Sequence, residues 1–247
     1  MGCKVMGIVN VTPDSFSDGG QFFRPEEAVR RAKNLVADGA DIIDLGGEST
    51  RPGATPIGWE EEWGRIGPVL AMLASSVSRP KSFRISVDTY HPETAARAIA
   101  AGADIINCVY AEPIPEMMKL LEGNAVELVV PWRAGDEDVR RETEDASIAS
   151  RLYLDPMIGF NTTREEDVEL LRSIPELAKR GRVLVGASRK RIVKKLVGEK
   201  SAVGKNIGGN VAIAVWAALR GASVVRVHDV RETVQALRVV EELKVEG

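Results

Sequence analysis

Asp38-Gly39-Ala40-Asp41-Ile42-Ile43 is the most telling segment for the architecture, because it returns twice along the chain. It recurs as Ala101-Gly102-Ala103-Asp104-Ile105-Ile106 and as Arg220-Gly221-Ala222-Ser223-Val224-Val225. Each glycine follows a segment of helical periodicity and precedes a β-branched run. This is the position after a helix at which a left-handed backbone is favoured. The repeated helix-to-strand joint predicts serial strand–helix units in a single domain, residues 1–247.

Short β-branched runs alternate with helical segments along the whole chain. The runs that predict strands are Val5–Val9, Ile42–Leu45, Phe83–Val87, Ile105–Asn107, Leu128–Val130, Leu152–Leu154, Val183–Val185 and Val224–Val227. Helices are predicted to begin near Pro25, Trp59, Pro92, Ile114, Asp138, Arg164, Arg189 and Arg231. This alternation predicts an α/β protein, a (β/α)8 TIM barrel. An open doubly wound sheet is the main alternative, but no Gly-x-Gly-x-x-Gly turn opens the first helix.

Composition narrows the classes of partner and the cellular compartment to be expected. The chain has 247 residues, 44% hydrophobic and 28% charged, with a net charge of -3. This charge argues against a nucleic-acid or membrane-surface partner. Cys3 and Cys108 share no metal or redox spacing, which favours a reducing compartment. There is no apolar N-terminal stretch, and the run Val211–Val225 is too short to span a bilayer. A soluble cytoplasmic protein is therefore expected.

Polar side chains follow the predicted strands. Barrel enzymes carry their catalytic groups at the carboxyl ends of the strands. Those ends hold Asn10, residues 48–51, Asp88, Asn107, Asp155, residues 188–190, Arg226 and His228. Aspartate, asparagine and serine at such points often cap the next helix, which is the simpler interpretation for each of them alone. Lys190, Arg226 and His228 cannot act as such caps, so the whole set favours a binding site.

The chemistry of this set suits a flat heterocycle that carries an anion. Asp88, Asn107 and Asp155 offer acceptors for the amidine-like N–H edge of a pterin or purine, and Lys190 offers a donor. The guanidinium of Arg226 can stack on a ring face and still reach a phosphate. With His228, Arg226 would form a cationic corner for a mono- or diphosphate.

Six motifs occur in an order that resembles dihydropteroate synthase, from about residue 5 to residue 230. They are Gly7-Ile8-Val9-Asn10-Val11-Thr12-Pro13-Asp14-Ser15-Phe16-Ser17-Asp18-Gly19-Gly20, Glu48-Ser49-Thr50-Arg51-Pro52-Gly53, Ser86-Val87-Asp88-Thr89, Asp155-Pro156-Met157-Ile158-Gly159-Phe160, Gly186-Ala187-Ser188-Arg189-Lys190 and Arg226-Val227-His228-Asp229-Val230. The resemblance implies a transferase of folate biosynthesis. Such an enzyme condenses 6-hydroxymethyl-7,8-dihydropterin pyrophosphate with 4-aminobenzoate to give 7,8-dihydropteroate and pyrophosphate.

The resemblance also implies roles for individual residues. Asp88, Asn107, Asp155 and Lys190 would bind the pterin, and Arg226 would cover its face. Asn10 would ligate Mg²⁺ on the pyrophosphate, which His228 and Arg226 would hold. Catalysis would involve Asp18, Thr50 and Arg51 from two mobile loops, with Lys190, Arg226 and His228. Phe16, Pro52, Phe160 and Lys190 would line the 4-aminobenzoate pocket, with Thr50 as a further substrate contact. A homodimer acting on small molecules is expected.

The chain departs from the family pattern at defined places. Residues 108–112, 131–133 and 161–163 differ from the usual segments, Arg191 replaces a small residue, and the N-terminal hairpin is missing or very short. Three alternatives therefore stay open. They are a methanopterin-type enzyme with a modified arylamine, a corrinoid methyltransferase using methyl-tetrahydrofolate, and a non-catalytic pterin-binding paralogue. Among the other residues, Cys108 is expected in the core, Trp132 at the barrel rim, and His91 as an exposed residue at a helix start.

Overall fold

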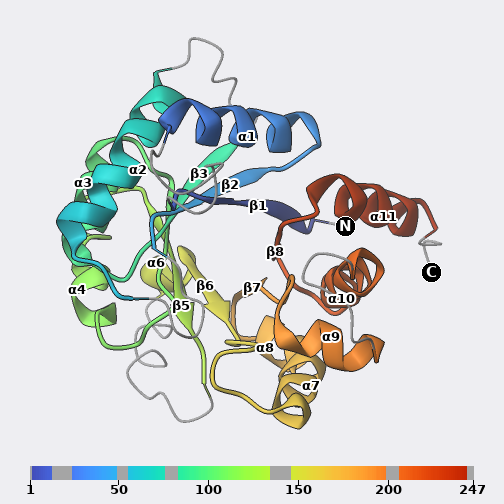
Figure 1. Ribbon diagram of the computed structural model, residues 1–247. Coiled ribbons are helices and arrows are strands. Elements are labelled where there is room, and N and C mark those ends of the chain that lie inside the picture. The colour runs from blue at the N-terminus through green and yellow to red at the C-terminus, as the bar shows by residue number, and fades with distance from the viewer. Residues whose placement is uncertain are drawn as a thin grey trace. The chain divides into compact units, whose positions relative to one another are not determined.

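The computed structural model describes residues 2–12, 24–48, 55–75, 83–133, 146–198 and 206–243. Its strands alternate with helices along the chain (Figure 1). The strands β1 to β8 are hydrogen-bonded in chain order, and β8 returns to pair in parallel with β1 to close a barrel. The predicted TIM barrel is confirmed.

The strands are β1 (Lys4–Asn10), β2 (Ile42–Gly46), β3 (Arg84–Asp88), β4 (Ile105–Asn107), β5 (Glu127–Pro131), β6 (Leu152–Asp155), β7 (Arg182–Val185) and β8 (Val224–Val227). The helices are α1 (Pro25–Ala37), α2 (Trp59–Ala74), α3 (Pro92–Ala100), α4 (Ile114–Lys119), α6 (Ala146–Ala149), α7 (Arg164–Arg172), α8 (Ile174–Ala178), α9 (Arg191–Val197), α10 (Ile207–Leu219) and α11 (Val230–Glu242). The predicted strands β4 and β8 agree to the residue, and the others differ by one residue at one or both ends.

The recurring joint behaves as predicted. Gly39, Gly102 and Gly221 have φ values of 102°, 94° and 101°. Residues with a side chain rarely adopt these backbone angles. Glycine therefore ends each helix and turns the chain into the next strand. The same local signal thus places the starts of β2, β4 and β8.

One helix starts later than expected, and another starts as expected but is interrupted. The helix predicted near Arg189 begins at Arg191, because Arg189 itself has a φ of 60° and cannot continue into a helix. The segment predicted from Arg164 is interrupted at Ser173, after which Pro175 opens α8. The start predicted near Asp138 lies outside the described residues, and α6 follows at Ala146.

The described chain divides into two compact units. One unit comprises Met1–Gly7, Asp38–Ala40 and Pro131–Gly247, and the other comprises Ile8–Ala37 and Asp41–Val130. A single domain over residues 1–247 stays a prediction. Within the described ranges, no helix combines the length and apolar character needed to cross a bilayer.

Candidate active site

In the unit that contains β2, β3 and β4, the carboxyl ends of these strands lie in register. Gly46 pairs with Asp88, and Asp88 pairs with Asn107. A Cβ atom added to Gly46 would lie 3.7 Å from the Cβ of Asp88. The absence of a side chain at Gly46 therefore leaves space beside the Asp88 carboxylate. The structure thus brings together Asp88 and Asn107, two of the predicted binding residues.

Buried polar atoms gather on the same three strands. Asp44, Ser86 and Asn107 are all fully buried, and the Asn107 side-chain amide donates to the Asp44 carboxylate over 3.3 Å. In the described part of the chain, Oδ1 of Asn107 and Oγ of Ser86 have no hydrogen-bond partner. Buried polar atoms are normally paired, so these two oxygens are suited to a ligand or an ordered water. The cluster is a candidate binding surface.

Sequence reasoning missed two members of this cluster, Asp44 and Ser86. Each is a polar residue between apolar neighbours of a short strand, Asp44 before Leu45 and Ser86 after Ile85. Both lie in strand segments whose buried residues are otherwise apolar. A buried polar residue in such a run is the signal that would have identified them.

The other unit carries Asp155, Lys190 and Arg226. Asp155 ends β6, is 3% exposed, and accepts a hydrogen bond of 2.7 Å from the main-chain N–H of Met157. Burial raises the pKa of the Asp155 carboxyl above its usual range, against the opposing effects of Lys190, the Met157 N–H and Arg226. The result is a buried acid that two cations face.

Lys190 contacts the loop between β6 and α7. Its Nζ donates to the carbonyl of Ile158 over 2.7 Å and lies 3.9 Å from the centroid of the Phe160 ring. A Cβ atom on Gly159 would come within 2.8 Å of the Lys190 side chain, and Gly159 has a φ of 78°. Glycine is therefore required there. The structure brings together Lys190 and Phe160.

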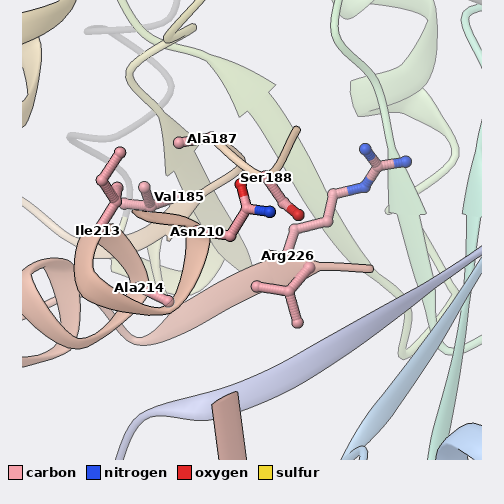
Figure 2. Close-up of a pocket in the computed structure, with 8 residues that line it drawn as sticks. Val185, Ala187, Ser188, Asn210, Ile213, Ala214 and Arg226 are labelled. Carbon is pink, nitrogen blue, oxygen red and sulfur yellow. The ribbon is translucent and has the colours of Figure 1, made fainter. Parts of the chain in front are cut away.

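Ser188 and His228 lie side by side at the ends of β7 and β8. Oγ of Ser188 is 3.1 Å from Nδ1 of His228, and the main-chain N–H of His228 donates to the same oxygen over 3.3 Å. Ser188 also lines a small pocket with Asn210 and Arg226, and Figure 2 shows the Arg226 guanidinium extending away from Asn210. Ser188 thus fixes the His228 imidazole and lines the same pocket as Arg226, the residue predicted to bind the pyrophosphate together with His228.

A second hydrogen-bond network sets the backbone before Lys190. Asn210, from α10, accepts from the main-chain N–H of Arg189 over 2.9 Å and donates to the Asp229 carboxylate over 3.1 Å. Arg189 donates to the other oxygen of Asp229 over 2.6 Å. The buried Asn210 therefore stabilises the positive φ of Arg189. No local pattern indicated a role for Asn210, since its partners lie 19 and 21 residues away along the chain.

Comparison with known proteins decides the family. A family model described as pterin binding enzyme matches residues 6–228. A dihydropteroate synthase from Streptococcus pyogenes is 35% identical over 97% of this chain and 95% of its own length. The chain belongs to the dihydropteroate synthase family. The resemblance seen in the motifs is thereby confirmed.

Solved dihydropteroate synthases share the fold. The Xanthomonas albilineans enzyme with 4-aminobenzoic acid has a TM-score of 0.85 and 37% identity, covering 99% of this chain and 94% of that chain. The same enzyme in complex with 7,8-dihydropteroate has a TM-score of 0.82 and 35% identity, covering 99% of this chain and 95% of that chain.

Asn10 is the residue that the family pattern associates with Mg²⁺. It is half-buried at the end of β1, and the next residue, Val11, donates its N–H to the carbonyl of Gly46. An amide oxygen at a strand end is a hard ligand of the kind that Mg²⁺ accepts, and Mg²⁺ commonly takes few protein ligands. Asn10 therefore fits the ion. The other predicted loop residues, Phe16, Asp18, Thr50, Arg51 and Pro52, lie outside the described residues.

Two of the positions that depart from the family pattern, Cys108 and Trp132, contribute to packing. Cys108 is fully buried, as expected for a core residue, and burial raises the pKa of its thiol to about 12. Trp132 is half-buried with Arg180 5.8 Å from its ring, which agrees with rim packing.

The expectation that His91 is exposed is wrong. Its ring is half-buried, with Nδ1 3.1 Å from a carboxylate oxygen of Glu62.

Proposed function

We propose that this member of the dihydropteroate synthase family condenses 6-hydroxymethyl-7,8-dihydropterin pyrophosphate with 4-aminobenzoate, releasing pyrophosphate and 7,8-dihydropteroate. The observation that carries the proposal is the buried Asp155 carboxylate beside Lys190 and Arg226. A buried carboxylate is costly unless it is paired, and a pterin offers it a planar pair of N–H donors. The solved relatives with 4-aminobenzoic acid and 7,8-dihydropteroate support the same reaction.

The pterin would be bound by polar residues at strand ends, as the family resemblance implies. Barrel enzymes bind their substrates at the carboxyl ends of their strands. Asp155 and Asn107 would accept N–H groups of the ring, and the Oδ1 of Asn107 lacks a partner among the described residues. Asp88 would provide a further acceptor and Lys190 a donor. Arg226 would lie on the ring face, as guanidinium groups do on aromatic systems.

The leaving group would be held by Arg226 and His228. The imidazole is oriented by Ser188, whose Oγ lies 3.1 Å from Nδ1. Nε2 would then contact the pyrophosphate. Fixed cationic and hydrogen-bonding groups stabilise charge as it develops on the departing pyrophosphate. Mg²⁺, bound through Asn10, would supply Lewis-acid stabilisation of the same charge.

The second substrate would attack the methylene carbon of the pterin as the carbon–oxygen bond to pyrophosphate breaks. The arylamine nitrogen supplies the electron pair for the new bond and then loses a proton. Phe160 and the Lys190 side chain would line its pocket, with Phe16 and Pro52. Asp18, Thr50 and Arg51 would act on the cationic carbon and the anion, and water exclusion would protect that carbon.

The arylamine is proposed to be 4-aminobenzoate itself. A modified arylamine with a phosphate group would need an additional cation, for which Arg191 is the candidate. However, the Arg191 guanidinium donates to the carbonyl of Thr162, so it already fastens the β6–α7 loop to the start of α9. Competition between 4-aminobenzoate and its ribosyl-phosphate derivative tests this choice.

We further propose a cytoplasmic homodimer. Trp216 and Leu219 of α10 and Val239 of α11 are 41%, 46% and 58% exposed. Exposed apolar side chains on two helices that pack together are suited to a contact between copies. Sedimentation of the purified protein gives its mass in solution and tests the proposal.

Replacing Arg226 with alanine tests the assignment of the site. We expect kcat/KM for the pterin pyrophosphate to fall at least about 10-fold, because a charged hydrogen-bond donor contributes about 1.5–3 kcal/mol. The exposed Arg238 on α11 provides a matched control, Arg238→Ala, which should keep full activity. Unchanged turnover and affinity in Arg226→Ala would remove Arg226 from the mechanism.

A further inference from the structure

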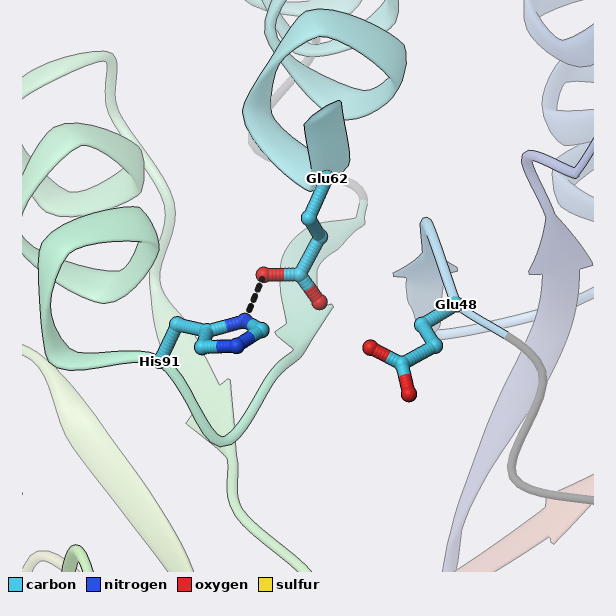
Figure 3. Close-up of side chains that lie close together, drawn as sticks. All are labelled: Glu48, Glu62 and His91. Atoms are coloured by element: carbon cyan, nitrogen blue, oxygen red, sulfur yellow. Dashed lines mark hydrogen bonds and ion pairs between the residues drawn. The ribbon is translucent and has the colours of Figure 1, made fainter. Parts of the chain in front are cut away.

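A cluster of possible metal ligands lies in the unit that contains β2 and β3. Glu48 follows β2, Glu62 belongs to α2, and His91 directly precedes α3. One candidate ligand atom from each residue lies within 4.8 Å of the other two. Figure 3 shows the three side chains directed toward a common space from three different elements. None of these residues has a role in the proposed reaction.

Glu62 is the buried member of the cluster. Its side chain is 1% exposed, and its Oε2 accepts from the Thr89 hydroxyl over 2.6 Å and lies 3.1 Å from Nδ1 of His91. Among the described residues, none donates a hydrogen bond to the other oxygen, Oε1. In Figure 3 this second oxygen points to the side on which Glu48 lies. Because a charged carboxylate in a buried side chain is costly unless it is neutralised, a positive ligand would be stabilised in this space.

Glu48 adds a second negative charge to the same space. The Tyr90 hydroxyl lies 3.1 Å and 2.9 Å from its two oxygens and donates to this carboxylate. Hydroxyl groups from Tyr90 and Thr89 thus orient both carboxylates from outside the cluster. Such outer hydrogen bonds commonly fix the ligands of metal sites. Across Glu48, Glu62 and His91, the imidazole is the only group that can carry a positive charge.

We propose that Glu48, Glu62 and His91 bind one divalent transition-metal ion, with Zn²⁺ as the best match. Two carboxylate oxygens and one imidazole nitrogen form a ligand set that zinc accepts, with water in the fourth position. The nitrogen that faces Glu62 is Nδ1, so the neutral imidazole would bind through it and lose any proton held there. Softer thiol ligands are absent from this cluster, and Mg²⁺ prefers oxygen ligands.

The metal would connect three elements at one point. It would join the end of β2 to α2 and to the segment between β3 and α3. Arg65 already donates to the carbonyl of Gly47 over 2.8 Å, so the chain beside Glu48 is held from α2 as well. Residue 48 directly precedes the segment that carries Thr50 and Arg51. We therefore expect a stabilising site distinct from the Mg²⁺ proposed at Asn10.

Zinc titration of the metal-free full chain tests this proposal. The protein is dialysed against a chelator and titrated calorimetrically with Zn²⁺ in the absence of substrates. One equivalent should bind, and His91→Gln and Glu48→Gln should each weaken binding at least about 10-fold. Since the chain has 2 histidines, His228→Gln is a matched control that should bind as the wild type does. Cys3→Ser controls for binding through the accessible thiol.

Two further measurements make the result decisive. Co²⁺ substitution should give a visible absorption band that is lost in His91→Gln and kept in His228→Gln. Saturating Zn²⁺ should raise the midpoint of thermal unfolding of the wild type but not of His91→Gln. Absence of binding at micromolar Zn²⁺, or equal binding by His91→Gln and the wild type, would overturn the proposal. Neither outcome affects pyrophosphate release, so the proposed function is tested separately.

Discussion

Ser188 and His228 are joined by two hydrogen bonds. The serine Oγ lies 3.1 Å from Nδ1 of the imidazole and accepts the main-chain N–H of His228 over 3.3 Å. This relationship fixes both the position and the orientation of the ring. It also couples the carboxyl ends of β7 and β8, which are neighbours in the barrel. A side chain oriented in this way loses little entropy when it binds an anion.

Replacing Ser188 with alanine should therefore weaken the handling of pyrophosphate. We expect kcat/KM for the pterin pyrophosphate to fall by up to about 10-fold, since a neutral hydrogen bond contributes about 0.5–1.5 kcal/mol. Steady-state kinetics provides the measurement. Ser150→Ala, at an exposed serine, is the control and should be unaffected. Equal kinetics for both variants would show that Ser188 does not orient His228.

Replacing Asp155 with asparagine should separate stability from binding. Because burial raises the folded-state pKa of Asp155, its ionised form costs stability above that pKa, and the cost disappears as pH falls below the unfolded value. Asp155→Asn should thus be more stable than the wild type at pH 8, by about 1 kcal/mol, and this advantage should shrink toward pH 4.

The same variant should lose pterin binding, because the amide cannot accept two N–H groups as a carboxylate does. Urea unfolding at several pH values and equilibrium binding of a pterin measure the two effects. A stability advantage that grows as the pH falls would contradict the assigned sign of the shift.

Replacing Asn210 with alanine should destabilise the protein. The change leaves the buried Asp229 carboxylate without one donor and removes the acceptor for the Arg189 N–H. We expect a loss of about 2 kcal/mol, seen as a fall of about 4–8 °C in the thermal midpoint. Asn124→Ala is a suitable control, since Asn124 lies on the surface and its side chain donates to the nearby carbonyls of Leu120 and Glu122. Similar midpoints for the two variants would remove Asn210 from the network.

Cys108 should not react with thiol reagents in the folded protein. It is fully buried, and its pKa of about 12 leaves almost no thiolate at pH 8. Of the 2 cysteines, Cys3 should react in the native state and Cys108 only after unfolding. A colorimetric thiol assay with and without urea gives the count. Two fast-reacting thiols in the native protein would contradict the buried position.

The fold was predictable because its signals are local. β-branched runs, helix periodicity and the glycines at 39, 102 and 221 each depend on a few neighbouring residues. The left-handed backbone of Arg189 was not predictable, since it depends on contacts with Asn210 and Asp229 far along the chain. The start of α9 was therefore placed two residues too early.

The candidate site was predictable where polar residues stand at strand ends, as for Asp155 and Lys190. Asp44 and Ser86 were missed because they lie inside strands whose other residues read as core. His91 was read as exposed because its partner, Glu62, is 29 residues away and belongs to another helix. In each case a contact with a residue far along the chain decided the environment of the side chain.

Pyrophosphate release from 6-hydroxymethyl-7,8-dihydropterin pyrophosphate, followed with and without 4-aminobenzoate, tests the central claim most directly. Release that depends on the arylamine, with one 7,8-dihydropteroate formed per pyrophosphate, is the result predicted. Pterin binding without release, or release that 4-aminobenzoate does not accelerate and that yields no 7,8-dihydropteroate, would contradict the proposed synthase activity.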